Sequence, residues 1–370
     1  MSEALEPATE EALADALRDA SGPLRVRGGG TRGGGSVGEG AILSTARLSG
    51  IALYEPGALT LVARAGTALA EIEAALAEHR QILPFEPMDH RALLGTSGEP
   101  TIGGAVATGA AGPRRVRVGG CRDSLIGARF VDGEGRVIRS GGRVMKNVTG
   151  YDLARLMAGA RGSLGVLTEV AFKLLPAPAA QATLTVRGLD VARAVAAMSA
   201  ALASPFEVSG AARDAEGATH LRVEGLADSV AYRAGRLGDL LASFGEAAVE
   251  DDPEAGAALW RRVRDAEDLA GAPGSVWRVA LRPSDAPAAA ASLDASRLVL
   301  DAGGATIWAL LPEGVDARAR LAVRGHAALV RGRGFPHIHP EPTAVAALSA
   351  GLRSRFDPRG ILDPGATAPA

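Results

Sequence analysis

The stretch that constrains the fold most is TIGGAVATGAAGP, residues 101–113. It carries no charged side chain and none larger than isoleucine. A backbone this bare lets a large planar ligand lie against it, while main-chain N–H groups point at a pyrophosphate or a ring carbonyl. A tightly packed helix start is the alternative explanation for the same residues.

Further glycine-rich blocks flank this stretch on both sides. They read RGGGTRGGG at residues 27–35, GGCRDSLIG at 119–127, and GRVMKNVTGYDL at 142–153 followed by GSLGVLT at 162–168. Consecutive glycines allow positive φ and bring several N–H groups toward one point, which suits phosphate oxygens. The first block is not a Walker A loop, because no Gly-Lys-Ser/Thr follows, and it lacks the amphipathic helix of a Rossmann fingerprint. Taken alone, it could equally be a flexible loop.

Composition narrows the classes of function. The 370 residues carry a formal net charge of -2, which argues against a protein that binds nucleic acid or anionic membranes. The single cysteine, Cys121, excludes an intrachain disulfide, a zinc finger and an iron–sulfur cluster held by this chain alone. No apolar run reaches the ~18 residues of a transmembrane helix, and the acidic N-terminus is unlike a secretory signal. We therefore expect a cytoplasmic protein without a membrane span.

The glycine-dense region gives way to an alanine-rich chain at LLPAP, residues 174–178. Proline and the residue before it interrupt regular structure, so we place a domain boundary there. We expect an α+β fold with a first domain over 1–176 and a small α+β second domain over 177–335. A C-terminal helix and tail over 336–370 would return to the first domain.

Periodicity and capping signals predict the individual elements. In the first domain we expect helices capped by Thr9 and Thr67, a helix at 152–158, and strands at 24–27, 59–63, 128–131, 136–139 and 166–174. In the second we expect strands near 182–187, 206–223, 276–282, 297–300 and 305–310, with helices near 190–203, 228–243 and 315–330. A further helix is expected at 343–355. A βαββαβ layout of this kind builds a small antiparallel sheet with helices on one side, and we find no internal repeat at a fixed period.

The order and spacing of the glycine blocks resemble the FAD-binding domain of the vanillyl-alcohol oxidase and p-cresol methylhydroxylase family. Within that family, PFEP (84–87), AGPRR (111–115) and VMKNVTGYDL (144–153) are similar to the FAD-binding subunits of bacterial glycolate oxidases. The resemblance is strong over residues 20–175 and weak over the tail, FDPRGILDPG (356–365). It implies a two-lobed FAD-binding domain of the p-cresol methylhydroxylase type with a reduced, ferredoxin-like α+β cap.

The resemblance also implies roles by position. The FAD pyrophosphate would be wrapped by Arg27, Gly28, Gly29, Gly30, Thr31 and Arg32. The diphosphate and the ring edge would be followed by Thr101, Gly103, Gly104 and Thr108. The flavin region would be supported by Arg122, Asp123 and Ser124, and the ribityl chain or the adenosine part would lie beside Gly162, Gly165 and the backbone of Val166. Members with covalent flavin carry a His just after the first loop, where this chain has Thr31 and Arg32, so we expect non-covalent FAD.

The function implied is that of an FAD-dependent 2-hydroxy-acid oxidoreductase subunit that oxidises glycolate to glyoxylate. Electrons would pass from the flavin to an iron–sulfur partner subunit, and a larger flavin subunit would complete the complex. The complex would reach the inner membrane only peripherally, through those partners. Two alternatives stay open: a stand-alone FAD-dependent dehydrogenase for a 2-hydroxy acid such as lactate, and a scaffold that has lost flavin.

No catalytic residue is assigned from the sequence, because the chain lacks the His-x-Gly-Asp-Gly-Asn type metal motif of related catalytic subunits. His337 and His339 would share a face of a strand and, with Glu341, could bind a metal; a docked polar tail is the alternative. A substrate carboxylate could be bound by Arg331, Arg333 or the cluster Arg114, Arg115 and Arg117, although solvated surface explains them too. Cys121 is expected to be a small buried thiol.

Overall fold

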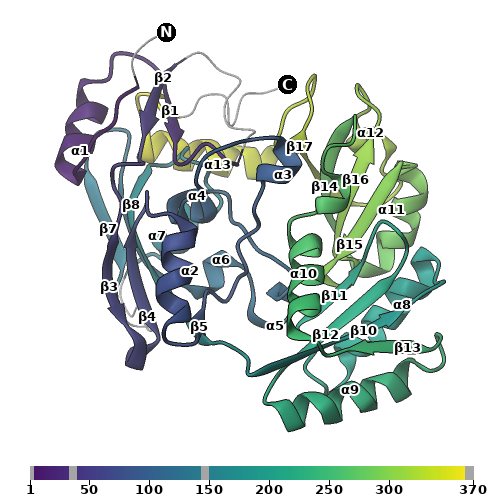
Figure 1. Cartoon of the computed structure of the whole chain (residues 1–370). Helices are drawn as coiled ribbons and strands as arrows, with labels where there is room; N and C mark the ends of the chain where they lie inside the picture. Colours follow the sequence, from purple (N-terminus) through teal and green to yellow (C-terminus); the bar gives the residue numbers. More distant parts are fainter. Residues whose placement is uncertain (1–3, 33–39, 143–149, 363–370) are drawn as a thin grey trace.

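The computed structural model describes residues 4–32, 40–142 and 150–362 (Figure 1). Its N-terminal half contains α1 (Glu10–Asp19), β1 (Leu24–Arg27), β2 (Ala41–Ser44), β3 (Ile51–Glu55), β4 (Thr60–Arg64), α2 (Leu69–Ala77), β5 (Gln81–Ile82), α3 (Arg91–Leu94), α4 (Ile102–Ala107), α5 (Arg115–Val118), α6 (Cys121–Ser124), β6 (Leu125–Val131), β7 (Val137–Gly141), α7 (Leu153–Met157), β8 (Val166–Lys173) and β9 (Leu175–Pro176). The rest contains β10 (Ala180–Val186), α8 (Val191–Ala203), β11 (Gly210–Arg213), β12 (Thr219–Gly225), α9 (Ala227–Leu241), β13 (Ala247–Glu250), α10 (Pro253–Arg264), β14 (Ser275–Leu281), α11 (Ala286–Leu293), β15 (Arg297–Asp301), β16 (Thr306–Leu311), α12 (Ala317–Arg320), β17 (Gly325–Arg331) and α13 (Thr343–Phe356).

The N-terminal half is built in two lobes. In the first, α1 packs on the parallel pair β1-β2, with Leu13, Leu17 and Leu43 fully buried between them. In the second, the antiparallel sheet β3-β4-β8-β6-β7 packs under α2, α4, α6 and α7. These helices are short because each provides only a few apolar residues to one side of the sheet, and buried packing rather than helix propensity stabilises them.

Strands β10 to β17 form one eight-stranded antiparallel sheet in the order β13-β10-β12-β11-β15-β16-β14-β17, and β5 and β9 form a separate antiparallel pair. Helices α8, α9 and α11 cover the face turned away from the N-terminal half, where they bury the largest apolar cluster (Figure 1). Its other face packs with Met88 and Leu93 of the N-terminal half, through Val276, Val299 and Trp308. The smaller of the two cavities described below lies where that face meets the N-terminal half.

The eight strands arrange as two βαββαβ units rather than one. The first unit, β10-α8-β11-β12-α9-β13, is followed by β14-α11-β15-β16-α12-β17 with the same order of helices and strands. The expected antiparallel, ferredoxin-like architecture is confirmed, and β13 and β17, which were not predicted as strands, complete the two units. The sequence shows no fixed-period repeat because the units share topology while their helices differ greatly in length, from four residues in α12 to fifteen in α9.

Most predicted elements are present, and two predictions about them are wrong. The helix expected over 315–330 is helical only over Ala317–Arg320, and Gly325–Arg331 instead pairs with β14 as an edge strand. Thr67 does not cap α2: its hydroxyl donates to the carbonyl of Arg64 at 2.7 Å and also bonds Gly50. Thr9, in contrast, caps α1 as predicted, accepting from the N–H of Ala12 at 3.1 Å.

The domain division at residues 176 and 335 stays a proposal, and two features of the fold support it. All strands of the five-stranded sheet precede residue 174, and all strands of the eight-stranded sheet follow residue 179. The C-terminal segment after α13 runs back to the first lobe, where the N–H of Leu24 donates to the carbonyl of Ile361 at 2.7 Å. Within the described residues, no helix is both long enough and apolar enough to cross a membrane.

Candidate functional site

The first glycine loop is packed against the chain that precedes α4. Strand β1 runs directly into Gly28, Gly29 and Gly30, and a Cβ on Gly29 would lie 1.6 Å from the carbonyl oxygen of Glu99. A Cβ on Gly28 would lie 2.5 Å from Thr101 Oγ1. These glycines are therefore needed for close contact between two backbone segments. Gly30 alone of the three has positive φ, at 72°.

Helix α4 carries the second group of predicted residues. Thr101 caps it, its Oγ1 accepting from the N–H of Gly104 at 3.2 Å, and Thr108 Oγ1 donates to the carbonyl of Gly104 at 2.8 Å. Gly103 faces the sheet, where a Cβ would lie 2.6 Å from the carbonyl oxygen of Ala65. Gly104 faces outward, with Thr101 Oγ1 at 3.1 Å as the nearest atom to a Cβ. The two adjacent glycines therefore serve different purposes: one allows packing on the sheet and the other leaves the outer side bare.

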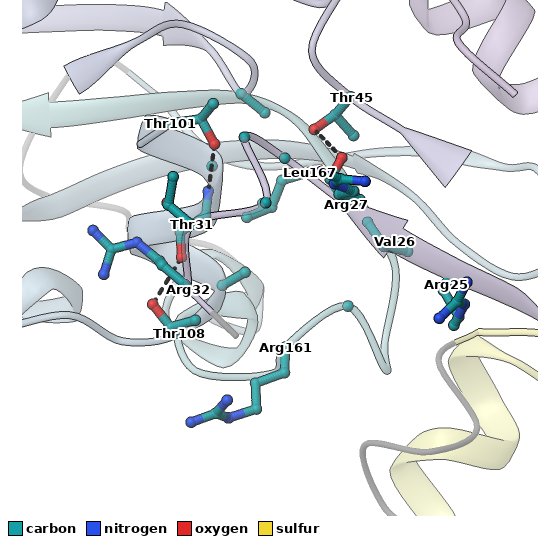
Figure 2. Close-up of a pocket in the computed structure, with 18 of the residues that line it drawn as sticks. Arg25, Val26, Arg27, Thr31, Arg32, Thr45, Thr101, Thr108, Arg161 and Leu167 are labelled. Atoms are coloured by element: carbon teal, nitrogen blue, oxygen red, sulfur yellow. Dashed lines mark hydrogen bonds between the residues drawn. The ribbon is translucent and has the colours of Figure 1, made fainter. Parts of the chain in front are cut away.

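The loop and α4 line one side of a cavity of about 320 Å³, which we call the nucleotide cavity (Figure 2). Twelve of the predicted binding residues line it: Arg27, Gly28, Gly29, Gly30, Thr31, Arg32, Thr101, Gly103, Gly104, Thr108, Gly162 and Gly165. The structure thus brings together segments that lie more than 130 residues apart in the sequence. What each residue binds stays a prediction.

The structure does not place the other four predicted residues on the cavity wall. Arg122, Asp123 and Ser124 form α6, where Asp123 accepts from the N–H of Gly120 at 2.7 Å and Ser124 donates to the carbonyl of Cys121 at 3.2 Å. Val166 is fully buried in the core of the first lobe. Its side chain points into that core, because alternate residues of a strand face opposite sides and its neighbour Leu167 lines the cavity.

Several lining residues were missed from the sequence. The apolar part of the wall includes Val26, Ile42, Ala65, Met157 and Leu167, and the polar part includes Arg25, Thr45 and Arg161. The sequence of β1 could have indicated Arg25, because Arg25 and Arg27 alternate with the apolar Val26 directly before the glycines and so share one face of the strand. The side chains of Arg25, Arg27, Arg32 and Arg161 lie along the cavity in Figure 2.

The cavity suits a dinucleotide with a flavin ring. Exposed main chain and arginines match the two negative charges of a pyrophosphate, and the apolar wall matches planar rings. Gly104 provides a direct check of fit, because its missing side chain leaves the wall bare beside Arg32, whose Cδ would lie 3.7 Å from a Cβ there. The residues present therefore fit FAD.

A second cavity of about 100 Å³, which we call the inner cavity, adjoins the nucleotide cavity. The two share Arg32, Thr108 and Arg161. Its other wall comes from β14, β16 and β17 of the eight-stranded sheet, with Arg278 and Trp308 among the lining residues. Arg278 was missed, although a charged residue inside the apolar run SVWRVAL is a sequence signal of a functional position.

Arg32 and His90 form a polar pair at the junction of the two cavities. Arg32 Nη1 lies 3.2 Å from His90 Nδ1; since a guanidinium only donates, Nδ1 accepts and the imidazole proton sits on Nε2. Burial, and then the charge of Arg32, lowers the pKa of His90 to about 3, so His90 is neutral at pH 7. Burial lowers the pKa of Arg32 to about 10, which leaves it charged. Its Nε and Nη2 are buried and have no hydrogen-bond partner among the described residues.

The histidine candidates do not form a metal site. His337 Nδ1 lies 2.9 Å from the carbonyl oxygen of Leu329, and His339 Nδ1 accepts from the N–H of Ala327 at 3.1 Å. Both therefore fasten the segment after β17 to that strand, and Glu341 is occupied with Ser349. No cluster of three or more metal-ligating side chains occurs in the described part of the chain.

The arginine candidates are also placed elsewhere. Arg331 donates to the carbonyls of Leu93, Leu269 and Ala272, and Arg333 is exposed. Arg114 pairs with Glu224 at 2.8 Å, and Arg117 pairs with Glu207. Arg115 lies close enough to the buried Arg278 to lower its pKa. None of these lines either cavity.

Cys121 lies in the core under the five-stranded sheet, as predicted. Its side chain is 1% exposed and packs among apolar residues. Burial raises the pKa of the thiol far above its ordinary value, so it stays protonated and unreactive at neutral pH. Cys121 contributes packing rather than chemistry.

The comparisons with known proteins agree with the geometry. A family model described as an FAD binding domain matches residues 2–141. The chain is 37% identical over 320 residues to the glycolate oxidase subunit GlcE of Escherichia coli (strain K12), across 85% of this chain and 84% of that protein. It is 30% identical over 178 residues to the D-lactate dehydrogenase of Archaeoglobus fulgidus, across 46% of this chain and 38% of that protein.

A solved structure confirms the fold class independently of sequence. A structure of alkyldihydroxyacetonephosphate synthase superimposes with a TM-score of 0.69 at 15% identity, across 97% of this chain and 75% of that chain. At this identity the likeness is one of fold. The sequence relationship goes further, because the alignment with GlcE spans 85% of this chain and therefore extends beyond the glycine-rich half. The chain therefore belongs to the family of FAD-binding oxidoreductases of 2-hydroxy acids that includes the glycolate oxidase subunit GlcE.

Proposed function

We propose that this chain is the FAD-binding subunit of a glycolate oxidase complex, which oxidises glycolate to glyoxylate. The observation that carries the proposal is that the two cavities adjoin and share Arg32, Thr108 and Arg161 in their walls. A bare-walled cavity for a dinucleotide meets a smaller cavity lined by arginines at the boundary between the two halves of the chain. A flavin enzyme needs two such spaces: a cleft that holds the nucleotide part of FAD and a space beside the flavin ring for the substrate.

The residues divide the work of holding FAD. The main chain of Gly28, Gly29 and Gly30, with Arg27 beside it, would bind the pyrophosphate, and Gly104 would let the flavin approach α4. FAD held by these residues would supply an acceptor for the hydride of the carbon that bears the hydroxyl group. In sum, glycolate loses two electrons and two protons and becomes glyoxylate.

We propose that the FAD is bound without a covalent link. The residues that follow the first glycine loop are Thr31 and Arg32, neither of which forms the histidyl link of covalent members. Precipitating the purified holoprotein with acid should therefore release FAD into the supernatant. Yellow colour that stays with the pellet would contradict this.

We also propose that electrons leave through an iron–sulfur subunit and that a larger flavin subunit joins the complex, which would lie at the inner membrane through these partners. Two observations support assembly. The only cysteine of the chain is buried, so a cluster must be held elsewhere. Helix α13 buries no residue and exposes Val345, Leu348 and Leu352, as interface surfaces commonly do.

The visible absorption spectrum of the purified chain, recorded before and after anaerobic glycolate, tests the proposal. Flavin bands are expected in the holoprotein. Bands that persist after glycolate would support a subunit that works with a partner, and bands that bleach would support the alternative of a stand-alone dehydrogenase. A chain that stays colourless after reconstitution with FAD would overturn both and favour a scaffold that has lost flavin.

A further inference from the structure

The inner cavity has a strongly positive lining. Arg32, Arg161 and Arg278 all line it, and none of its described lining residues is an aspartate or a glutamate. Buried cations are normally paired with carboxylates, because an isolated charge is costly away from water. This chain follows that rule elsewhere, for example where Arg222 meets Glu86. The described lining of the inner cavity offers no such carboxylate to Arg32 or Arg278.

Arg32 has donor groups left over. Arg32 Nε and Nη2 are buried without a hydrogen-bond partner among the described residues. Arg278 lies over the ring of Trp308, with 6.0 Å between its Cζ and the ring centroid, and that contact occupies the face of the guanidinium rather than its N–H groups. Burial lowers the pKa of Arg278 to about 10, so it too stays charged at neutral pH.

Nearby acidic groups do not reach into the cavity to neutralise these charges. Asp89 is held by Arg91, with Nη2 and Oδ2 2.8 Å apart, and Asp265 is held by Arg264 at 2.7 Å. His90 is neutral and accepts from Arg32. Asp301, whose charge acts on Arg278, does not line the cavity and accepts from the N–H of Ala302 at 2.6 Å. Arg32 and Arg278 therefore give the cavity a positive charge that an anion from solution can neutralise.

The rest of the wall limits the size of that anion. Met88, Trp308, Leu329 and Val330 close the cavity with apolar surface. The volume of about 100 Å³ holds only a few non-hydrogen atoms, since one water in liquid occupies about 30 Å³. A carboxylate attached to one or two further carbons fits this combination of charge, size and apolar surroundings.

We propose that Arg32 and Arg278 together form an anion subsite that binds the carboxylate of a two- or three-carbon acid. The subsite joins the two halves of the chain, because Arg32 follows β1 and Arg278 lies on β14. A guanidinium binds a carboxylate through two parallel N–H···O bonds, and Arg32 has two unused nitrogens for this purpose. The inference rests on the proposed function, because it names the site at which the small acid would lie.

Isothermal titration of the holoprotein with glycolate, in a buffer of low anion content, tests the subsite. The variant Arg278→Met keeps much of the side-chain volume and removes the charge, and its dissociation constant should rise about 10- to 100-fold, the range for losing a charged hydrogen bond. The matched control is Arg282→Met, because Arg282 directly follows the same strand and its side chain is 78% exposed. The control should bind glycolate as the wild type does.

Two comparisons on the wild-type chain keep the test independent of folding in the variants. Glycolamide has nearly the shape of glycolate without its charge and should not bind, and affinity should fall steeply from lactate to 2-hydroxyhexanoate. Equal binding of glycolate and glycolamide, or of glycolate by the wild type and Arg278→Met, would overturn the subsite. A holoprotein with FAD but no glycolate affinity would overturn it while leaving FAD binding intact, whereas failure to bind FAD would overturn the proposed function instead.

Discussion

A Cβ built on Gly104 lies 3.1 Å from Thr101 Oγ1 and 3.7 Å from Arg32 Cδ, on the wall of the nucleotide cavity. Valine at this position would fill ligand space without meeting any backbone. We therefore expect Gly104→Val to lower FAD affinity at least about tenfold, which corresponds to about 1.4 kcal/mol. The ratio of flavin to protein absorbance after purification measures this loss.

The control for this substitution is Gly235→Val in α9. Gly235 is also helical, and a Cβ there would have no heavy atom within 4 Å, so valine changes helix propensity by the same amount at both positions. Full flavin content in Gly104→Val would show that α4 does not face the cofactor. Gly29 is a poorer test, because a side chain there would collide with the carbonyl of Glu99 and displace the whole loop.

At the residue scale, the sequence indicated which glycines lie in the candidate site, but it did not indicate residues that join the site only through tertiary contacts. The packing of Gly103 on the sheet agrees with the tightly packed helix start that was one explanation of residues 101–113, whereas the close contact of Gly28 with Thr101 was not predicted. Arg278 and His90 could not be assigned, because they meet Arg32 only after two distant segments pack together. Val166 was predicted to contribute its backbone only, and that stays a prediction; its side chain is buried in the core of the first lobe.

At the element scale, α4 depends on one hydroxyl. Thr101 Oγ1 caps the helix through Gly104, and the same hydroxyl occupies the space next to Gly28. We expect Thr101→Ala to lower the free energy of unfolding by about 1 kcal/mol, the usual value of an N-cap, and to weaken FAD binding because Gly104 loses its anchor. Thr101→Ser keeps the hydroxyl and should behave like the wild type. Urea unfolding of the wild type and the two variants measures this free energy. An equal loss of stability in both variants would show that the methyl group of Thr101, and not its hydroxyl, stabilises the helix.

The elements that sequence patterns misassigned share a physical cause. Residues 315–330 contain apolar residues at helical spacing, yet Gly325–Arg331 pairs along β14 because an unpaired edge of the sheet accepts it. Thr67 has the composition of a helix cap, but the turn near Gly50 uses its hydroxyl first. In both cases a tertiary contact outweighed a local preference, which is a few tenths of a kcal/mol per residue for helix propensity and about 1 kcal/mol for an N-cap. Helix α1 was predicted correctly because Thr9 has no competing partner among the described residues.

At the scale of the whole molecule, a buried ionic network joins the two halves. Glu86 accepts from Arg222 through both oxygens, at 2.9 and 3.0 Å, and from the N–H of Arg114 at 2.6 Å. Arg114 also pairs with Glu224 on β12. Burial alone would raise the pKa of Glu224, but the charges of Arg222 and Arg114 outweigh it and lower the pKa to about 2. The pKa of Glu86 is lowered for the same reason.

The sign of the pH dependence follows from these shifts. A carboxyl whose pKa is lower in the folded than in the unfolded chain stabilises the fold above its ordinary pKa, near 4.5. That contribution is lost as the pH falls toward the folded value, about 2 for Glu224. We expect the free energy of unfolding, measured with urea, to decrease steeply between about pH 4.5 and 2. A flat profile there would mean that the network contributes little.

Two ion pairs between the halves of the chain, one buried and one exposed, allow the contribution of burial to be measured. Glu86 meets Arg222, whose side chain is 2% exposed, whereas Glu207 meets Arg117 with both side chains about half exposed, at 52% and 51%. Glu86→Gln leaves a buried guanidinium without its counter-charge and should cost roughly 3–5 kcal/mol of unfolding free energy. Glu207→Gln should cost less than about 1 kcal/mol, because water already screens that pair.

Urea unfolding at pH 7 measures the cost of both substitutions. The difference between the two variants should shrink as the pH falls below 4.5, because protonation of the Glu86 carboxylate in the wild type removes its advantage over the amide. Similar costs for the two substitutions would mean that the halves are joined by apolar packing around Met88 and Leu93 and not by this network.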